Sequence, residues 1–348
     1  MSRLKLIHVG LGRWGFDWAR EVFHQTPEVE VAAYVDRDPT PLLRLQAELG
    51  VSADICFTDL AAALEAVEAD AAVVSLPLEH HVAVTMQALE AGKHVVVEKP
   101  FARSPAEAAP VVSLAERLGL TLMVSQNYRY YPTPVMAADI VRSGQLGPLH
   151  SVKIDFRRHA PSEGYRYWGL PDPLLVDMAV HHYDLMRMVV GEEPCEINCR
   201  TWNPPGSPFT GDPAGAIVAL FPSGVSVSYR GTWLDRAPQT AWAGEWQMDF
   251  ENGVVFWTSR GDRPDGVMRD RLTIHRPGAP IEDLQLVRGR HDRPAVLQAF
   301  SQAVATGGAP RHFSSGRDNL RTLEVLDAAL QSAAMKGAAV TLAQSSAR

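Results

Sequence analysis

The sequence predicts an α/β fold in two parts: an N-terminal doubly wound parallel sheet, then a domain built on an open, mainly antiparallel sheet. The first 125 residues alternate short apolar runs with helical patterns joined by short links, as repeated βαβ units do. Later, strand-like runs follow one another directly, which is typical of an antiparallel sheet with one covered face. We therefore expect a boundary near Gln126, with domains over residues 1–125 and 126–348.

Local signals place the N-terminal elements in order. Strands are expected at 4–9, 29–35, 71–76, 94–97 and 121–125, and helices at 13–24, 41–49, 59–67, 82–91 and 105–118. Gly50 and Gly92 suit the left-handed position that ends a helix. Ser104 is a helix cap followed by proline at the first helical position. Right-handed crossovers between such strands give a doubly wound sheet.

The second part has a different rhythm. Helices are expected at 132–142, at 174–190 with Gly191 as its end, and in the tail at 294–305 and 316–336. Strands are expected at 150–158, 196–202, 214–221, 225–233, 245–250, 254–257 and 271–275. Ser223-Gly224 is a turn between two of these strands.

Composition excludes several classes of protein. The formal net charge of −7, without a block of like charges, argues against nucleic acid or an anionic membrane as a partner. No apolar run approaches the roughly 20 residues of a membrane span. The three cysteines fit neither a disulfide framework nor a CxxC metal site. A strand beginning at Leu4 leaves no room for a signal peptide, so we expect a cytoplasmic protein.

A glycine-rich turn, Gly10-Leu11-Gly12-Arg13-Trp14-Gly15, follows the first strand and opens the first helix. In this setting Gly10 allows a tight turn, and Gly12 lets the backbone approach a phosphate. Gly15 allows the helix to pack closely on the strand. The turn therefore predicts a dinucleotide site.

Asp36 ends the second strand, where an acidic side chain accepts hydrogen bonds from the ribose hydroxyls of adenosine. This favours NAD over NADP. Arg37 keeps NADP open, because a guanidinium there could meet a 2′-phosphate or stack on adenine.

Glu98-Lys99-Pro100 follows the strand at 94–97. Since proline favours extended backbone in the residue before it, the Lys99 ammonium is expected at the strand's carboxyl end, where open α/β sheets bind ligands. There it would donate to a substrate hydroxyl or carbonyl; an ordinary surface lysine is the alternative. Glu98 would pair with Lys99, contact the cofactor or cap a helix.

Asp177, His181 and Asp184 are spaced i, i+4 and i+7 on one expected helix, so they share a face. Histidine titrates in the range useful for taking a proton from an alcohol, and Asp177 would orient the substrate or the imidazole. Asp184 is either part of that site or a structural cap or ion-pair partner. A divalent ion held by the three is an alternative, although no further ligand cluster stands out.

The junction at 126–132 carries Asn127 and Arg129, which are candidates for cofactor or substrate contacts; a polar hinge with packed tyrosines is the alternative. The loop before the Asp177 helix is rich in aromatic and guanidinium groups, which suit a polyhydroxylated ring. These residues are Arg158, Tyr165, Arg166, Tyr167 and Trp168.

The adjacent pairs His80-His81 and His181-His182 are not expected to share a ligand, because neighbouring helical residues point about 100° apart. His81 would instead cap the helix after Pro77 or lie near the cofactor.

Together these motifs resemble the Gfo/Idh/MocA family, named for glucose–fructose oxidoreductase, inositol dehydrogenase and a rhizopine-catabolism protein. The similar stretches are GLGRWG at 10–15, Pro77 through His81 to LEAGKHVVVEKP at 89–100, NYRYYP at 127–132, DMAVHHYDL at 177–185 and the tail GRDNLRTLEVLDAALQSA. They cover nearly the whole chain. Leu78 and Ala179 depart from a frequent asparagine and a frequent glycine, and Leu78 would remove one cofactor hydrogen bond.

The resemblance implies a Rossmann domain followed by an open antiparallel sheet, whose outer face makes homodimers or homotetramers. Cofactor and substrate would meet at the domain junction. It also implies a catalytic trio of Lys99, Asp177 and His181. His181 would take the hydroxyl proton while hydride leaves the same carbon for the nicotinamide. Lys99 would stabilise the alkoxide, and Asp177 would hold the substrate or tune the histidine.

The chain is thus expected to be an NAD(P)-dependent dehydrogenase acting on a secondary alcohol of a sugar, sugar acid or cyclitol. Predicted cofactor contacts are Gly10, Gly12, Arg13, Trp14, Gly15, Asp36, Arg37, Ser75, Pro77, His81, Glu98, Lys99 and Asn127. Predicted substrate contacts are Lys99, Arg129, Arg158, Trp168, Asp177 and His181, and no metal is expected. The alternatives are an NAD-retaining glycosidase, a cofactor-sensing regulator, and a reductase of an aromatic diol or a tetrapyrrole. The intact trio argues against the regulator.

Overall fold

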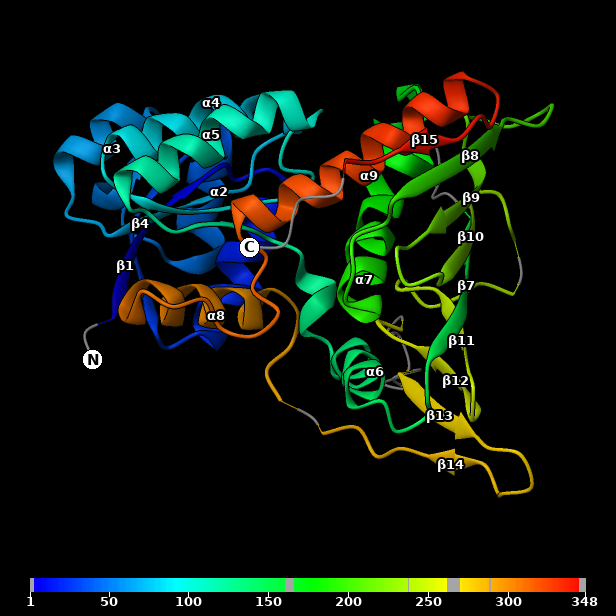
Figure 1. The fold of residues 1–348 in the computed structure, drawn as a ribbon. Coiled ribbons are helices and arrows are strands. Elements are labelled where there is room, and N and C mark those ends of the chain that lie inside the picture. Colours follow the sequence, from blue (N-terminus) through cyan, green and yellow to red (C-terminus); the bar gives the residue numbers. More distant parts are fainter. Residues whose placement is uncertain (1–2, 160–165, 237, 262–269, 288, 344–348) are drawn as a thin grey trace. The chain divides into compact units, whose positions relative to one another are not determined.

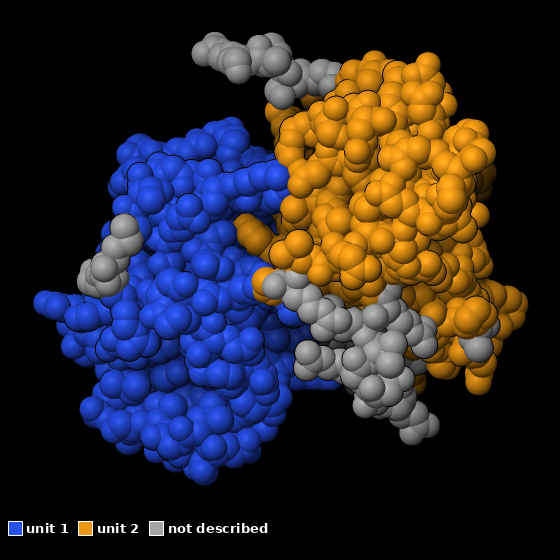
Figure 2. Space-filling model, turned by 90° about the horizontal axis from the view of Figure 1, so that it is seen from below, with its two compact units in different colours: residues 1–127, 290–320 blue, residues 128–289, 321–348 orange. Residues whose placement is uncertain are grey.

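The computed structural model describes residues 3–159, 166–236, 238–261, 270–287 and 289–343. Internal contacts divide the chain into two units, coloured separately in Figure 2. Unit 1 comprises residues 1–127 and 290–320, and unit 2 comprises residues 128–289 and 321–348. The first change of unit lies close to the boundary expected near Gln126. The return of 290–320 to unit 1 was not expected, because an amphipathic pattern does not say which sheet a helix covers.

Unit 1 is built on a six-stranded parallel sheet in the order β3-β2-β1-β4-β5-β6. The strands are β1 Leu4–Val9, β2 Val29–Val35, β3 Cys56–Phe57, β4 Ala71–Val74, β5 His94–Val97 and β6 Leu122–Val124. This confirms the doubly wound parallel sheet. The order reverses between β1 and β4, and in such sheets ligands bind outside the carboxyl ends of the strands at that point. The sequence did not reveal β3, because two residues are too few to show a period.

Helices cover both faces of this sheet (Figure 1). They are α1 Arg13–Asp17, α2 Pro39–Leu49, α3 Leu60–Ala66, α4 Leu78–Glu90, α5 Pro105–Leu118 and α8 Asp292–Thr306. Alternate side chains of β1 and β2 supply the two cores: Ile7 and Val35 pack toward α3, while Tyr34 packs toward α1 and α2. Asp38, Asp59 and Ser104 cap α2, α3 and α5 through their side-chain oxygens.

The helix expected at 13–24 is α-helical only in its first five residues. It continues as a π-helical turn over Trp18–Val22 and a 3₁₀ turn over Phe23–Gln25. Apolar spacing does not distinguish these hydrogen-bonding patterns, so the sequence could not predict the change.

Unit 2 is built on a nine-stranded sheet in the order β14-β13-β12-β11-β7-β10-β9-β8-β15. The strands are β7 Leu149–Arg157, β8 Glu196–Trp202, β9 Ala214–Leu220, β10 Ser226–Thr232, β11 Glu245–Phe250, β12 Gly253–Thr258, β13 Arg271–His275, β14 Glu282–Asp283 and β15 Val340–Thr341. Within the described ranges the β7–β10 pair is parallel, and the other pairs are antiparallel. The predicted mainly antiparallel sheet is confirmed.

One face of this sheet is covered by helices within unit 2 (Figure 1). These are α6 Pro132–Ser143, a π-helical turn Leu174–Ala179, α7 Val180–Val190 and the later part of α9 Gly316–Ala334. On β7, Val152, Ile154 and Phe156 are buried toward the helices, while the residues between them face the other side.

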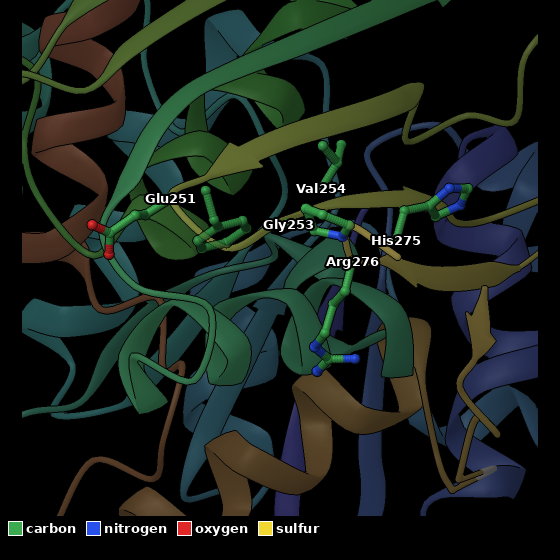
Figure 3. Close-up of a pocket in the computed structure, with 7 residues that line it drawn as sticks. Glu251, Gly253, Val254, His275 and Arg276 are labelled. Atoms are coloured by element: carbon green, nitrogen blue, oxygen red, sulfur yellow. The ribbon is translucent and has the colours of Figure 1, made fainter. Parts of the chain in front are cut away.

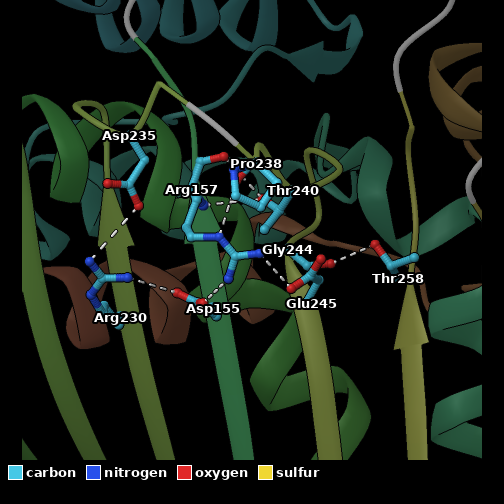
Figure 4. Close-up of polar contacts among 9 residues, drawn as sticks. All are labelled: Asp155, Arg157, Arg230, Asp235, Pro238, Thr240, Gly244, Glu245 and Thr258. Carbon is cyan, nitrogen blue, oxygen red and sulfur yellow. Dashed lines mark hydrogen bonds and ion pairs between the residues drawn. The ribbon is translucent and has the colours of Figure 1, made fainter.

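The other face carries a polar network across β10, β7, β11 and β12 (Figure 4). Arg157 contacts Asp155 and donates from Nη2 to a Glu245 carboxylate oxygen at 2.8 Å. The guanidinium of Arg230 lies 3.5 Å from Asp155. Such partly exposed pairs stabilise a fold only slightly, so they chiefly keep this face polar.

No helix in the described part of the chain is long and apolar enough to cross a membrane.

Candidate functional site

The glycine turn after β1 is geometrically demanding. Gly10 has a φ of +94°, and a Cβ there would lie 2.7 Å from the carbonyl oxygen of Ser75. A Cβ on Gly15 would lie 1.8 Å from the carbonyl oxygen of Gly10. By contrast, a Cβ on Gly12 meets no atom within 4 Å. The fold itself therefore requires glycine at 10 and 15, whereas at 12 the backbone is open on the side where a side chain would stand.

The Asp36 carboxylate at the end of β2 holds this turn in place. Its Oδ2 accepts a hydrogen bond from the backbone N–H of Leu11 at 2.7 Å, and its Oδ1 accepts from that of Asp38 at 3.0 Å. Arg13 and Arg37 are both exposed. Each Asp36 oxygen retains accepting capacity for a further donor, such as a ribose hydroxyl.

A buried histidine without a recognisable sequence motif, His8, lies behind the turn. His8 Nε2 lies 2.8 Å from Ser75 Oγ, which lies 2.8 Å from the Gly10 carbonyl oxygen. Since the serine has one hydroxyl hydrogen, it donates to Gly10 while accepting from His8. Burial lowers the pKa of His8 to about 3, so its ring is neutral. The available signal was a histidine within an otherwise apolar strand.

Glu98 and Lys99 follow β5 and are half-buried. The Trp18 indole N–H donates to Glu98 Oε1 at 2.8 Å, and the Lys99 backbone N–H donates to Glu98 Oε2 at 3.2 Å. Glu98 is thus bonded to the π-helical turn.

His81 lies within α4, where its two ring nitrogens are 2.8 Å from the carbonyl oxygens of Leu76 and Pro100. It therefore links the segment after β4 to the segment after β5 rather than capping a helix. Burial lowers the pKa of His81. Pro77 is the N-terminal cap residue of α4, without a side-chain hydrogen bond.

The start of α8 adds residues from the far end of the chain to unit 1. The Asn127 amide donates to the carboxylate of Asp292. The guanidinium carbon of Arg293 lies 4.8 Å from the centroid of the Trp14 ring and 5.7 Å from that of Trp18. No sequence motif indicated Arg293, because its contacts depend on the surface against which α8 packs.

In unit 2, Asp177 lies on the π-helical turn Leu174–Ala179, and His181 lies in the first turn of α7. The single α-helix expected at 174–190 is therefore π-helical over its first turn. This correction matters because the shared face was inferred from α-helical spacing, whereas π-helical turns are wider and frequent at functional sites.

The His181 imidazole is 5% exposed and stacks on the Tyr128 ring, with centroids 3.9 Å apart and planes 1° from parallel. Arg260 Nη1 donates to the Tyr128 hydroxyl at 2.5 Å, and its guanidinium carbon lies 4.7 Å from that ring. Arg260 has a φ of 57°, a conformation that non-glycine residues rarely adopt. At this junction, packed tyrosines were only the alternative expectation, and Arg260 gave no signal in the sequence.

Arg129, a candidate for a cofactor or substrate contact, is paired with Asp184 in unit 2. Its guanidinium donates twice to the Asp184 carboxylate, at 2.5 and 2.6 Å, and both side chains are buried. Thr322 also donates to Asp184, at 2.9 Å. The charge of Arg129 is therefore balanced inside the core of unit 2. We assign Arg129 and Asp184 a structural role and do not carry Arg129 into the proposed site.

Arg158 and Trp168 are the remaining substrate candidates. Arg158 is buried on the helix-covered face, with its guanidinium carbon 3.9 Å from the Trp242 ring centroid. Its Nη1 donates to the Gln239 side chain at 3.1 Å. The Trp168 indole N–H is buried, and no described residue accepts its hydrogen bond. Tyr165 lies outside the described residues.

One surface hollow lies away from these residues. A hollow of about 370 Å³ is lined by residues at the β11–β12 turn and after β13 (Figure 3). These are Phe250, Glu251, Gly253, Val254, His275, Arg276 and Pro277. Trp242 and Arg260 flank the opposite end of the β11–β12 hairpin, about 20 Å away along six-residue strands. None of the predicted site residues lines this hollow.

Both parts of the chain match known protein families. Residues 4–126 match the family described as "Oxidoreductase family, NAD-binding Rossmann fold". Residues 135–275 match the "GFO/IDH/MocA C-terminal domain". The chain belongs to the Gfo/Idh/MocA oxidoreductase family.

Two relatives of similar sequence and one solved structure of similar fold agree with this family assignment. The chain is 26% identical to a dTDP-3,4-didehydro-2,6-dideoxy-alpha-D-glucose 3-reductase of Streptomyces violaceoruber, covering 89% of this chain and 90% of that protein. It is 26% identical to a D-apiose dehydrogenase of Paraburkholderia graminis, covering 87% and 81%. An oxidoreductase from Agrobacterium radiobacter, solved with NAD⁺, shares the fold with a TM-score of 0.84 at 21% identity, covering 98% of each chain.

The Gfo/Idh/MocA Rossmann domain binds NAD, and the residues of unit 1 fit that cofactor. The backbone at Gly12 is open, as a phosphate-binding turn requires. The guanidinium nitrogen Nη1 of Arg293 is buried, and no described residue accepts a hydrogen bond from it. Among the described residues, no group of three or more His, Cys, Asp or Glu side chains is arranged to hold a metal ion.

Proposed function

We propose that this Gfo/Idh/MocA protein is an NAD-dependent dehydrogenase that oxidises a secondary alcohol of a sugar, sugar acid or cyclitol. The observation that carries the proposal is His181, a proton-accepting group stacked on Tyr128, in a chain whose other unit binds NAD. The names of the relatives, a D-apiose dehydrogenase and a dTDP-hexose 3-reductase, support a carbohydrate substrate. The polar and aromatic groups of Arg158 and Trp168 also suit such a substrate.

Three residues carry the proposed chemistry. His181 Nε2 or Nδ1 accepts the proton of the reacting hydroxyl. The Lys99 ammonium donates a hydrogen bond to the same oxygen and stabilises the negative charge that develops there. Asp177 orients the substrate through a neighbouring hydroxyl or tunes the basicity of His181. Bound NAD supplies the hydride acceptor. Asp36 selects NAD by accepting from the adenosine ribose, since a 2′-phosphate there would meet its carboxylate.

A second candidate is a glycosidase that keeps its NAD and oxidises a ring carbon only transiently. It would also need a hydride acceptor and a proton acceptor, such as bound NAD and His181. Net cofactor reduction distinguishes the two enzymes, because the glycosidase returns the hydride within each turnover.

The test is a reduction assay with the purified protein. NAD and NADP are offered separately with inositols, aldoses, sugar acids and glycosides, while absorbance of the reduced cofactor and release of free sugars are both followed. The proposal predicts net reduction of NAD by one group of substrates. Glycoside cleavage without net reduction assigns the glycosidase, and cofactor binding without any turnover assigns a cofactor-sensing regulator.

We further propose that the protein forms homodimers or homotetramers through the open face of the unit 2 sheet. Val218, Leu220 and Phe256 each expose between 37% and 43% of their surface on β9 and β12. The polar network of Figure 4 lies on the strands between them. Val218→Lys is expected to lower the sedimentation coefficient toward the monomer value, and an unchanged coefficient would contradict this surface.

A further inference from the structure

Arg293 is a half-buried charged side chain of unit 1 whose Nη1 has no acceptor among the described residues. It stands in the first turn of α8, and its guanidinium lies against the Trp14 and Trp18 rings. Its Nη1 is buried, and no described residue accepts a hydrogen bond from it. No carboxylate of the described residues lies within ion-pair distance. A buried guanidinium N–H without an acceptor is costly, so its presence needs an explanation.

The neighbouring carboxylates are already engaged. Glu98 accepts from the Trp18 indole, and Asp292 accepts from the Asn127 amide. Arg290, three residues before Arg293, is paired with Glu28 at 2.8 Å. In the segment that enters α8, the charge of Arg290 is therefore balanced by Glu28, whereas Arg293 lies next to the glycine turn.

The position of Arg293 suits an anion at the carboxyl edge of the parallel sheet. Trp14 belongs to the glycine turn after β1, and α8 packs against β5 and the π-helical turn. Asp36 marks the adenosine end at β2, on the opposite side of β1 from β5. In a dinucleotide that lies across this edge, the pyrophosphate comes after the adenosine ribose and next to the glycine turn.

We infer that Arg293 binds the pyrophosphate of NAD. The guanidinium would lie between the pyrophosphate and the Trp14 indole ring, which holds it in position. Arginine presents planar donors that match phosphate oxygens, and aromatic faces hold the guanidinium by cation–π attraction. The buried Nη1 then gains the acceptor that it lacks within the protein. This inference rests on NAD binding by the Rossmann domain and not on the proposed alcohol substrate.

The test is calorimetric titration of the full-length protein with NAD, ADP-ribose and adenosine. Arg293→Gln is expected to weaken both NAD and ADP-ribose by about 10- to 100-fold, because both carry the pyrophosphate. Adenosine, which has no phosphate, is expected to bind as to the wild type. Arg293→Lys keeps the charge but not the planar donors, and an intermediate loss is expected.

Arg290→Gln is the matched control, because it removes the same charge three residues away from a group already paired with Glu28. Its NAD affinity is expected to stay within about twofold of wild type. Equal losses in Arg290→Gln and Arg293→Gln would overturn the inference, as would unchanged ADP-ribose binding in Arg293→Gln. If Arg293→Gln does not fold, Arg293→Lys decides: wild-type affinity for ADP-ribose contradicts the contact.

This outcome is separable from that of the proposed function. A protein that reduces no cofactor with any alcohol would contradict the dehydrogenase, while its binding of ADP-ribose would still test Arg293.

Discussion

Lys99 is the residue whose removal separates chemistry from cofactor binding. If its ammonium stabilises the developing alkoxide, Lys99→Ala lowers kcat by about 10²-fold or more. NAD affinity stays near the wild-type value, since the glycine turn and Asp36 remain. Steady-state kinetics and calorimetric NAD titration measure the two quantities. Lys93→Ala, at the other end of β5, is the control, because its ammonium is bonded to the Ala69 carbonyl. Turnover in Lys99→Ala equal to that in Lys93→Ala would refute the role.

Tyr128 is predicted to position the His181 ring through stacking. Tyr128→Phe keeps the stacked ring and loses only the hydroxyl that accepts from Arg260, so kcat is expected to change little. Tyr128→Leu removes the ring contact and is expected to lower kcat by about two- to tenfold, as for the loss of one aromatic pair. The pH dependence of kcat is also expected to shift in Tyr128→Leu, because the surroundings of His181 change. A wild-type pH profile in that variant would leave Tyr128 a purely structural residue.

At this scale the sequence was informative where chemistry follows from chain position. The positions of Asp36 after β2 and of Lys99 after β5 could be predicted because each follows a recognisable strand. His8, Tyr128, Arg260 and Arg293 could not, since their contacts join segments far apart in the sequence. The sequence suggested a ligand contact for Arg129 but could not indicate its buried partner, because Asp184 lies on a separate helix.

In the glycine turn, some glycines are required by the fold and another by the bound phosphate. Gly12 has a φ of −60° and open space at its Cβ position, so Gly12→Ala is compatible with the fold. A methyl group there would obstruct the approach of a phosphate, and NAD affinity is expected to fall by roughly tenfold or more. Thermal denaturation is expected to show an unchanged Tm without NAD.

Gly15→Ala is the contrasting change, because its Cβ would lie 1.8 Å from the Gly10 carbonyl oxygen. This variant is expected to lose stability in the absence of NAD. Two results would contradict the description of the turn: a large fall in Tm for Gly12→Ala, or wild-type NAD affinity in the same variant.

Among the elements, β1, β2, β5 and α5 were predicted to the residue, because each has an apolar run or a capping signal at its ends. Both π-helical turns escaped prediction. They lie at Trp18–Val22 and Leu174–Ala179, beside the residues proposed for cofactor and substrate. Such π-helical turns are frequent at functional sites, where they interrupt a regular α-helix.

For the whole molecule, two buried neutral histidines predict a loss of stability in acid. Burial lowers the pKa of His8 to about 3 and that of His182 to about 4, from an ordinary value of 6.5. The unfolded chain therefore binds protons that the folded chain does not as the pH falls below 6.5. Their stabilising contribution is complete above pH 6.5 and decreases as the pH falls toward 4.

Urea denaturation at pH 7 and pH 5 checks this prediction. His8→Gln and His182→Gln are expected to show a smaller fall in unfolding free energy between the two pH values than the wild type. His24→Gln, at an exposed position, is the control and is expected to behave as the wild type. An equal fall in all four proteins would contradict the neutral, buried state of both rings.

Molecular organisation was predictable up to the point where it depends on long-range packing. The parallel and antiparallel sheets followed from two different rhythms of apolar residues. The assignment of 290–320 to unit 1 did not, and with it Arg293 was missed. The spacing of apolar residues in α8 predicts a helix. The surface that this helix covers depends on the complementary faces of β5 and the π-helical turn Trp18–Val22.

The most direct test of the proposed function follows the hydride itself. The best substrate from the reduction assay is prepared with deuterium on the carbinol carbon and incubated with the protein and NAD. Mass spectrometry then determines whether deuterium enters the cofactor. Net hydride transfer predicts one deuterium per reduced nicotinamide, and the role of His181 predicts a slower reaction in the His181→Ala variant. Substrate consumption with no deuterium in the cofactor pool would contradict oxidation by net hydride transfer.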